Sequence, residues 1–302
     1  MAEQMAAVGW QGITLMVPTD WSLVGVNGDE KKGYFRVDGP IASALEVRWA
    51  SVVDKSPDLM NKAREFISGL EKNYRKKKIK FSSKIKPDNS SGESVNFTWQ
   101  ADQLGQGRLL YCESCKRVII AQVISVRDDN ISHVIPVILS SLCDHRDDGW
   151  MDWALYGLAF AIPPGYKIEK QKLMSGYLSL SFKNKARTLI VERWGLANTL
   201  LAGDELGEWY SKDVQLDIKG YRVKSEKYEI AGHDGLKTVG KRSGIKQLLK
   251  AIAYSFTLYP HPGYLTGYAW HCKESNRLFS IRATHIENDD VAEKVRDFIK
   301  CH

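Results

Sequence analysis

The sequence has few of the features that mark specialised protein classes. No run of about 18 apolar residues occurs in the 302-residue chain, so no transmembrane segment is expected. The first residues lack the basic start of a secretory signal, and we therefore expect a cytoplasmic protein. Five cysteines in a reducing compartment argue against a disulfide framework. The net charge of +7 is mild, although it allows weak attraction to nucleic acid or to an acidic protein.

The common catalytic and nucleotide-binding motifs are also missing. The chain contains no Gly-x-Ser-x-Gly, no His-Glu-x-x-His and no glycine fingerprint after a predicted strand. Residues 235–241 fit the start of a phosphate-binding loop, but Arg242 stands where Ser or Thr must hold magnesium. His233 lies in a Gly-rich turn, where such a residue usually serves the turn itself. We therefore expect a non-catalytic protein without a cofactor, a structural zinc ion excepted.

What the sequence does contain is an internal repeat. Residues 12–18 begin with glycine, alternate in polarity and end in proline, and Trp21 follows. Residues 157–163, followed by Tyr166, repeat this pattern. Alternation at period two predicts a strand with one buried face, and proline ends its pairing. The pattern therefore predicts the same opening strand in each half of the chain.

Further matches follow in the same order in both halves. Residues 34–37 match 177–180, and residues 45–49 match 190–194. Predicted helices follow at 58–73 and 204–217. Each half then contains a Cys and an Arg five residues apart and ends in a short helix. The remaining strand-like runs predict an antiparallel sheet. We therefore predict an α+β fold of two tandem modules, residues 1–146 and 147–302. Each would have a mid-module helix and a C-terminal helix.

This order of elements resembles the Mog/PsbP-like fold. The residues that carry the resemblance are 12–21 and 157–166, with the terminal strand and helix of each half. Families with this fold look like small non-catalytic binding modules. One set is similar to regulators of a nuclear-transport GTPase, and another to extrinsic photosystem subunits. The resemblance implies a binding or accessory role by analogy of fold, and no functional residue is carried over.

Cysteine and histidine residues recur at similar places in the two halves. One interpretation is structural zinc in tetrahedral sites. The first half would supply Cys112, Cys115, Cys143 and His145, and the second half His271, Cys272, Cys301 and His302. Adjacent ligands at 271 and 272 are awkward for a closed site. The alternatives are buried, unreactive thiols and disulfides.

Two other groups of residues are candidates for binding a partner. The densest basic strip comprises Arg75, Lys76, Lys77, Lys78 and Lys80. With aromatic neighbours at 74 and 81 it fits a phosphate backbone with stacked bases, and the alternative is a solvated helix end. The second group, predicted to pack against a partner or between the modules, comprises Trp150, Trp153 and Trp209.

The expected function follows from the repeat and the missing catalytic set. We expect a protein-interaction or accessory/assembly factor with two paired binding modules, whose partner is another protein or a macromolecular complex. The alternative is a basic nucleic-acid- or ribosome-associated factor, which would show steep salt dependence of binding.

Overall fold

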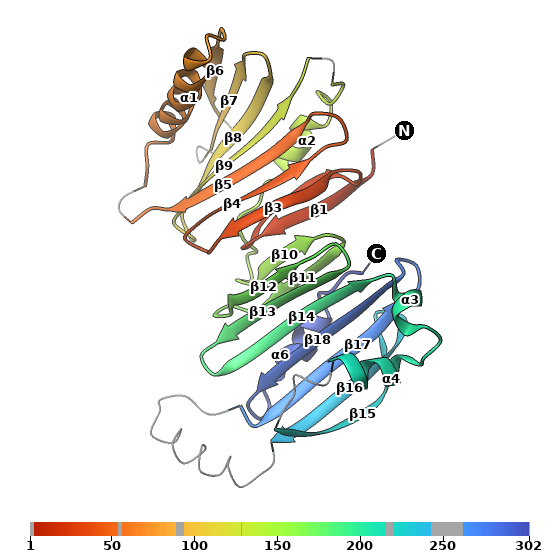
Figure 1. Ribbon diagram of the computed structural model, residues 1–302. Helices are drawn as coiled ribbons and strands as arrows, with labels where there is room; N and C mark the ends of the chain where they lie inside the picture. Colours follow the sequence, from red (N-terminus) through yellow and green to blue (C-terminus); the bar gives the residue numbers. More distant parts are fainter. Residues whose placement is uncertain are drawn as a thin grey trace. The chain divides into compact units, whose positions relative to one another are not determined.

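The chain forms two compact units, Met1–Tyr156 and Gly157–His302. The computed structural model describes residues 3–53, 56–88, 94–127, 129–214, 220–242 and 262–301. The boundary predicted from the sequence, after residue 146, lies ten residues earlier. Each unit contains one seven-stranded antiparallel sheet (Figure 1). In the part of the chain that the structure describes, no membrane-spanning helix is found.

The large sheet of unit 1 has the order β3-β4-β5-β9-β8-β7-β6. Its strands are β3 (Ser22–Gly28), β4 (Lys32–Asp38), β5 (Ala44–Ser51), β6 (Ser82–Pro87), β7 (Ser94–Gln100), β8 (Leu104–Cys112) and β9 (Arg117–Ser125). In the same unit β1 (Met5–Trp10) pairs with β2 (Ile13–Pro18) and with β10 (Met151–Leu155).

The sheet of unit 2 has the order β12-β13-β14-β18-β17-β16-β15. Its strands are β12 (Lys167–Leu173), β13 (Tyr177–Asn184), β14 (Arg187–Gly195), β15 (Tyr221–Ile230), β16 (His233–Arg242), β17 (Tyr264–Cys272) and β18 (Arg277–His285), and β11 (Leu158–Ile162) precedes them. Numbered along the chain, both sheets follow the order 1-2-3-7-6-5-4. The two sheet-rich halves therefore share one connectivity.

The predicted α+β class is wrong, because the chain is mainly antiparallel sheet. Among the described helices only α1 (Leu59–Lys76) is long, and Asp58 caps it by accepting a hydrogen bond from the Asn61 N–H at 3.0 Å. The other described helices are α2 (Ile135–Ser140), α3 (Ala197–Leu201), α4 (Leu206–Trp209), the π-helical turn η1 (Tyr210–Val214) and α6 (Val291–Arg296).

The terminal helices are short for a reason visible in their residues. In α2 the β-branched Ile135, Val137 and Ile138 lower the helix propensity, and Pro136 fits only the first turn. The predicted helix 204–217 contains Gly207 in its interior and changes to a π-helical turn at Tyr210. Residues 215–217 of that prediction lie outside the described residues. Both segments therefore form only short helical pieces in the described part of the chain.

The helix α1 covers only part of one face of its sheet (Figure 1). Its apolar side packs on β7 and β8 through Ala63, Ile67, Phe97 and Leu109. On β9, Ile120 packs against the same cluster, and its cross-strand partner on β5 is the exposed Arg48. The β4–β5 part of this face is therefore open beside the helix.

Candidate functional site

The hairpin β8–β9 and the segment after α2 meet at one end of unit 1. Strand β8 ends at Cys112, Cys115 lies in the turn, and β9 begins at Arg117. After α2 the chain pairs with β2, because Cys143 and Thr14 exchange two backbone hydrogen bonds of 2.9 Å. This bridge fixes the next two residues, Asp144 and His145, beside the hairpin turn.

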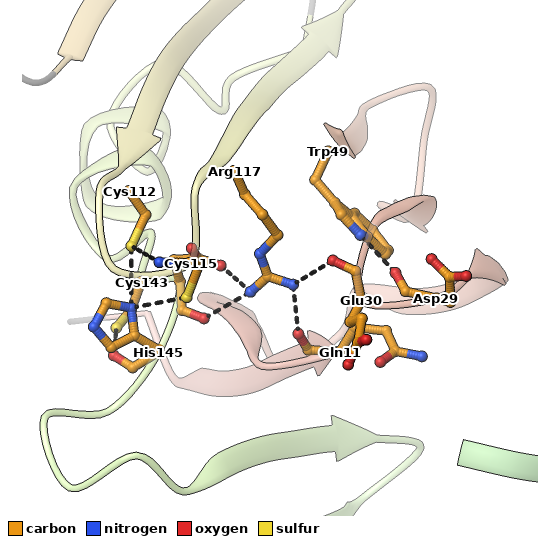
Figure 2. A network of polar contacts seen from close by, with 10 residues as sticks. Gln11, Asp29, Glu30, Trp49, Cys112, Cys115, Arg117, Cys143 and His145 are labelled. Atoms are coloured by element: carbon orange, nitrogen blue, oxygen red, sulfur yellow. Dashed lines mark hydrogen bonds and ion pairs between the residues drawn. The ribbon is translucent and has the colours of Figure 1, made fainter. Parts of the chain in front are cut away.

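Four donor groups converge there. The Nδ1 atom of His145 lies 3.3 Å from the Cys112 sulfur and 3.4 Å from the Cys115 sulfur (Figure 2). The backbone N–H of Cys115 also donates to the Cys112 sulfur at 3.4 Å. A carboxylate oxygen of Asp144 belongs to the same group, and all four ligand atoms lie within 4.8 Å of one another. Thiol, imidazole and carboxylate are the donors that zinc takes in proteins.

Cys143 does not join this group. Its side chain is exposed and its sulfur donates to the His145 carbonyl oxygen at 3.0 Å. Cys143 was predicted as a ligand and Asp144 was not, although Asp144 stands between the predicted ligands Cys143 and His145. Both Cys143 and Asp144 lie in the short segment after α2. Strand pairing at Cys143 turns the side chain of Asp144, and not that of Cys143, toward the hairpin.

A buried arginine stands behind the cluster. The guanidinium of Arg117 donates to the carbonyl oxygens of Gln11 at 3.1 Å, Glu30 at 3.3 Å and Asp144 at 3.2 Å (Figure 2). It also forms an ion pair with Oδ1 of Asp144, and both side chains are almost completely buried. The other carboxylate oxygen, Oδ2 of Asp144, is buried without a hydrogen-bond partner among the described residues.

The protein environment keeps the two thiols protonated when no cation is present. Burial raises the pKa of Cys112, and burial together with the nearby Asp144 carboxylate raises the pKa of Cys115 to about 12. A nucleophilic cysteine needs the opposite shift, since the thiolate is the reactive form. These cysteines therefore suit a packing or ligand role better than attack on a substrate.

Unit 2 contains a second, smaller cluster of His233, Cys272 and Cys301, all buried. Nε2 of His233 lies 3.3 Å from the Cys301 sulfur, and its Nδ1 lies 3.6 Å from a carboxylate oxygen of Glu274. Burial, and then the neighbouring Cys272, raises the pKa of Cys301 to about 11.

The position of this cluster corresponds to that in unit 1. Cys272 ends β17 as Cys112 ends β8, and Lys300 pairs with Ala159 as Cys143 pairs with Thr14. The next residue is Cys301 in unit 2 and Asp144 in unit 1. Of the ligands predicted for this half, Cys272 and Cys301 come together, whereas His271 is not in the group. The predicted ligand His302 lies outside the described residues.

His233 was missed as a member, because its place in a Gly-rich turn fitted a purely local role. His271 follows Trp270 and precedes Cys272 on one strand, so its side chain points to the opposite face from theirs. Strand alternation alone would have excluded it from a site built on Cys272.

A long groove lies on the open face of the unit 1 sheet, beside α1. Its larger part has a cavity volume of about 1330 Å³, and a smaller part of about 710 Å³ shares Arg48 with it. We call these two parts together the α1 groove. Its lining includes Tyr34, Val118 and Ile120 from the sheet and the cations Lys31, Lys32, Arg48, Lys62, Lys72, Arg75 and Lys76.

The basic strip predicted from the sequence divides between different structures. Arg75 and Lys76 belong to the last turn of α1 and line the α1 groove, while Lys77 and Lys78 follow the helix. Lys80 is exposed in the loop before β6. The two aromatic neighbours, Tyr74 and Phe81, stack on each other at 5.6 Å and pack against Trp99. Their rings belong to the core under α1 and are not presented to a base.

Two of the three predicted partner-binding tryptophans are core residues. Trp153 is 1% exposed and packs edge-on against Trp10 at 4.8 Å, and Trp209 is 3% exposed and packs against Trp194 at 5.0 Å. Trp150 is partly exposed. A partner cannot contact the first two without unfolding the surface above them.

Comparison with known proteins finds neither a matching family model nor a matching curated protein. Among solved structures, a cyanobacterial PsbP from Synechocystis sp. is 13% identical and covers 48% of this chain and 94% of its own, with a TM-score of 0.36. The immunity protein TplEi of the T6SS from Pseudomonas aeruginosa, solved with an "L" peptide, is 10% identical and covers 98% of each chain, with a TM-score of 0.33.

A chain of the Tle4–Tli4 complex is 11% identical and covers 98% of this chain and 97% of its own, also with a TM-score of 0.33. The PsbP-like resemblance seen in the sequence thus meets a partial match, and two neighbours come from complexes with a peptide or a protein. Scores of this size carry neither a fold nor a function over to this chain.

Proposed function

We propose that this chain is a non-catalytic protein-binding factor, and that the α1 groove receives an acidic, extended segment of its partner. The observation that carries the proposal is the combination of an apolar floor and a basic rim in one open groove. Tyr34, Val118 and Ile120 offer apolar surface, and cationic side chains surround it.

The rim of the α1 groove carries an excess of positive charge. Exposed Lys31, Lys32, Lys72 and Lys76 form no ion pair within the described part of the chain, and Asp29 and Glu65 are the carboxylates in the lining. Asp29 already accepts the backbone N–H groups of Lys31 and Lys32. An acidic partner would therefore meet unpaired cations at the edge and bury apolar side chains on the floor.

Among the described residues of unit 2, the equivalent face of the sheet is not open in this way. The corresponding face of its sheet is covered by Trp209, Tyr210 and Val214, which pack on Ala269 and Leu278. The two units thus share a connectivity but differ in what covers this face. This difference favours binding through unit 1.

A protein partner is favoured over nucleic acid by the placement of the aromatic rings. Binding of single-stranded nucleic acid relies on exposed rings on which bases stack. In this chain Tyr74 and Phe81, the rings nearest the basic strip, are packed against each other and Trp99. The raised pKa values of Cys112, Cys115 and Cys301 support a role without thiol catalysis.

The test is selection of peptides from a displayed random library on the full-length chain, followed by affinity measurement for the selected sequences. We expect enrichment of Asp and Glu next to apolar residues. The double change Lys32→Glu, Lys72→Glu should weaken binding of these peptides by about tenfold or more. The matched control is Lys84→Glu, Lys86→Glu on the exposed strand β6, outside the groove, and it should leave the affinity unchanged.

Two results would contradict the proposal. One is a selected pool without acidic enrichment. The other is an equal loss of affinity in the β6 variant, which would mean general charge attraction. Tight, salt-sensitive binding of a single-stranded oligonucleotide, lost on changing Lys84 and Lys86, would favour the nucleic-acid alternative.

A further inference from the structure

We propose that unit 1 binds one zinc ion between Cys112, Cys115, Asp144 and His145. The inference does not depend on the proposed partner binding. It rests on the donor geometry, on a buried carboxylate oxygen without a partner, and on the charge balance of the site.

The spacing of the donors matches a tetrahedral zinc site. Zinc–ligand bonds of roughly 2.0–2.3 Å place neighbouring ligands roughly 3.3–3.8 Å apart in a tetrahedron. The Nδ1 atom of His145 lies 3.3 Å and 3.4 Å from the sulfurs of Cys112 and Cys115. The fourth donor, Asp144, lies within the 4.8 Å limit that contains the whole group.

The Asp144 carboxylate points to a ligand independently of the cysteines. Its side chain is 3% exposed, and Oδ2 has no hydrogen-bond partner among the described residues. A buried carboxylate oxygen left in this way costs free energy, and a metal ion in the cluster would satisfy it. Arg117 holds Oδ1 of the same carboxylate, as a supporting residue behind a metal ligand does.

The charges of the site balance when zinc is bound. Two thiolates and one carboxylate carry three negative charges, which the zinc ion and the Arg117 guanidinium neutralise together. Without the cation, the same place combines a buried ion pair with two thiols that both contact one imidazole nitrogen of His145. Zinc explains why two cysteines, a histidine and an aspartate with a buried counterion are gathered at this hairpin.

Four protein ligands fill a tetrahedral site, so this zinc would be structural. It would join the turn between β8 and β9 to the segment after α2, which already pairs with β2 through Cys143 and Thr14. The expected effect is a raised thermal stability of unit 1, because only the folded state assembles the four ligands.

The experiment measures the zinc content of the full-length chain, purified without chelator, by elemental analysis and native mass spectrometry. Cys115→Ser should lower the zinc content by one ion per chain relative to the unchanged protein. Cys143→Ser is the matched control, since this cysteine adjoins the cluster but points away from it, and it should keep the zinc. Comparison with the unchanged chain isolates this site from the cluster in unit 2.

Cobalt(II) added to the chelator-treated chain should give thiolate charge-transfer and tetrahedral bands that Cys115→Ser reduces and Cys143→Ser retains. The melting temperature of the unchanged chain should fall with chelator and recover with zinc. If Cys115→Ser does not fold, His145→Gln at the partly exposed ligand supplies the same comparison.

Several results would overturn the inference. They are an unchanged chain that binds no zinc tightly, equal zinc in Cys115→Ser and in the unchanged chain, and equal loss in the Cys143→Ser control. A mass deficit that locates a disulfide between Cys112 and Cys115 in the protein as isolated would also overturn it.

Discussion

Arg117 and Asp144 form a buried ion pair that joins the first residue of β9 to the segment after α2. The two side chains are 6% and 3% exposed, and the arginine also donates to three backbone carbonyl groups. A pair of this kind stabilises little relative to apolar packing, but removing one partner leaves an uncompensated buried charge.

Replacement of Arg117 should therefore destabilise unit 1 strongly. For Arg117→Gln we expect a loss of about 3–5 kcal/mol in the free energy of unfolding, measured by urea denaturation. The control is Lys62→Gln, which breaks the exposed Lys62–Glu65 pair of 2.8 Å and should cost less than about 1 kcal/mol. Equal effects of the two changes would show that burial does not decide the cost.

The close approach of β4 to Trp49 sets a second prediction. A Cβ at Gly33 would lie 2.1 Å from the Trp49 ring, whose Nε1 donates to the Asp29 carbonyl oxygen at 2.8 Å. Gly33→Ala should displace the ring and cost about 1–3 kcal/mol. Gly69→Ala in α1, where the new Cβ meets nothing within 4 Å, should stabilise by about 0.5–1 kcal/mol. Thermal unfolding of both variants measures the opposite signs, and a stable Gly33→Ala variant would refute the contact.

Acid sensitivity in unit 2 should depend on Asp289. The hydrogen bond from Lys294 at 3.0 Å, aided by the charges of Lys294 and Arg187, holds the pKa of Asp289 below its ordinary value of 3.8. A lowered carboxyl pKa stabilises the fold above the ordinary value, and this contribution is lost as the pH falls through the folded-state pKa.

Asp289→Asn should therefore lower stability at neutral pH, by no more than about 1 kcal/mol because the side chain is partly exposed. The difference from the unchanged chain should shrink at about pH 3. Urea denaturation at the two pH values measures this, and a difference that persists in acid would contradict the ion-pair explanation.

The N-terminus of α1 offers a fourth prediction. Asp58 accepts the Asn61 N–H at 3.0 Å, and the first turn of the helix has no other acidic residue. Asp58→Ala should cost about 1 kcal/mol, with Asp58→Asn closer to the unchanged chain because asparagine also caps. Urea denaturation of the two variants provides the comparison. Equal losses would mean that the carboxylate acts through its charge and not as a cap.

The sequence predicted the order of the strands along the chain better than their register in the sheets. Alternating runs and matched turns were enough to place antiparallel strands in the same order in both halves. The predicted match of residues 45–49 with 190–194 aligns Arg48-Trp49 with Arg193-Trp194. In the sheets, Trp49 pairs with Ile119, the third residue of β9, and Trp194 pairs with Leu278, the second residue of β18. When Trp49 and Trp194 are aligned, the register of β5 on β9 thus differs by one residue from that of β14 on β18.

A shift of one residue moves every side chain to the other face of a sheet. Trp49 therefore lies in the core against Phe35, while Trp194 faces the opposite side and packs on Trp209. Arg193 takes the core-facing place, where burial lowers its pKa to about 10. The shared Arg-Trp sequence therefore did not predict which side chain faces the core. Strand pairing decides this, and it depends on partners distant in the sequence.

The candidate site was predicted in part for a similar reason. Cys112, Cys115 and His145 were found because zinc ligands have a recognisable composition and spacing. Asp144 and His233 were missed because long-range contacts bring them to their clusters. The bridge between Cys143 and Thr14 of β2 positions Asp144, and the folding of β16 beside β17 brings His233 to Cys272 and Cys301. Local patterns identify which residues are able to bind, but tertiary pairing decides which of them face one another.

Part of the excess positive charge lies on the outer strands of the two sheets, where it affects pairing with other chains. Strand β6 exposes Lys84 and Lys86 at the edge of one sheet, and β12 exposes Lys167, Lys170 and Lys172 at the edge of the other. An edge strand with free backbone groups is a template for pairing with another chain, and lysines along it repel a second copy. We therefore expect these lysines to oppose edge-to-edge pairing between copies of this strand-rich protein, so that neutralising them should promote aggregation.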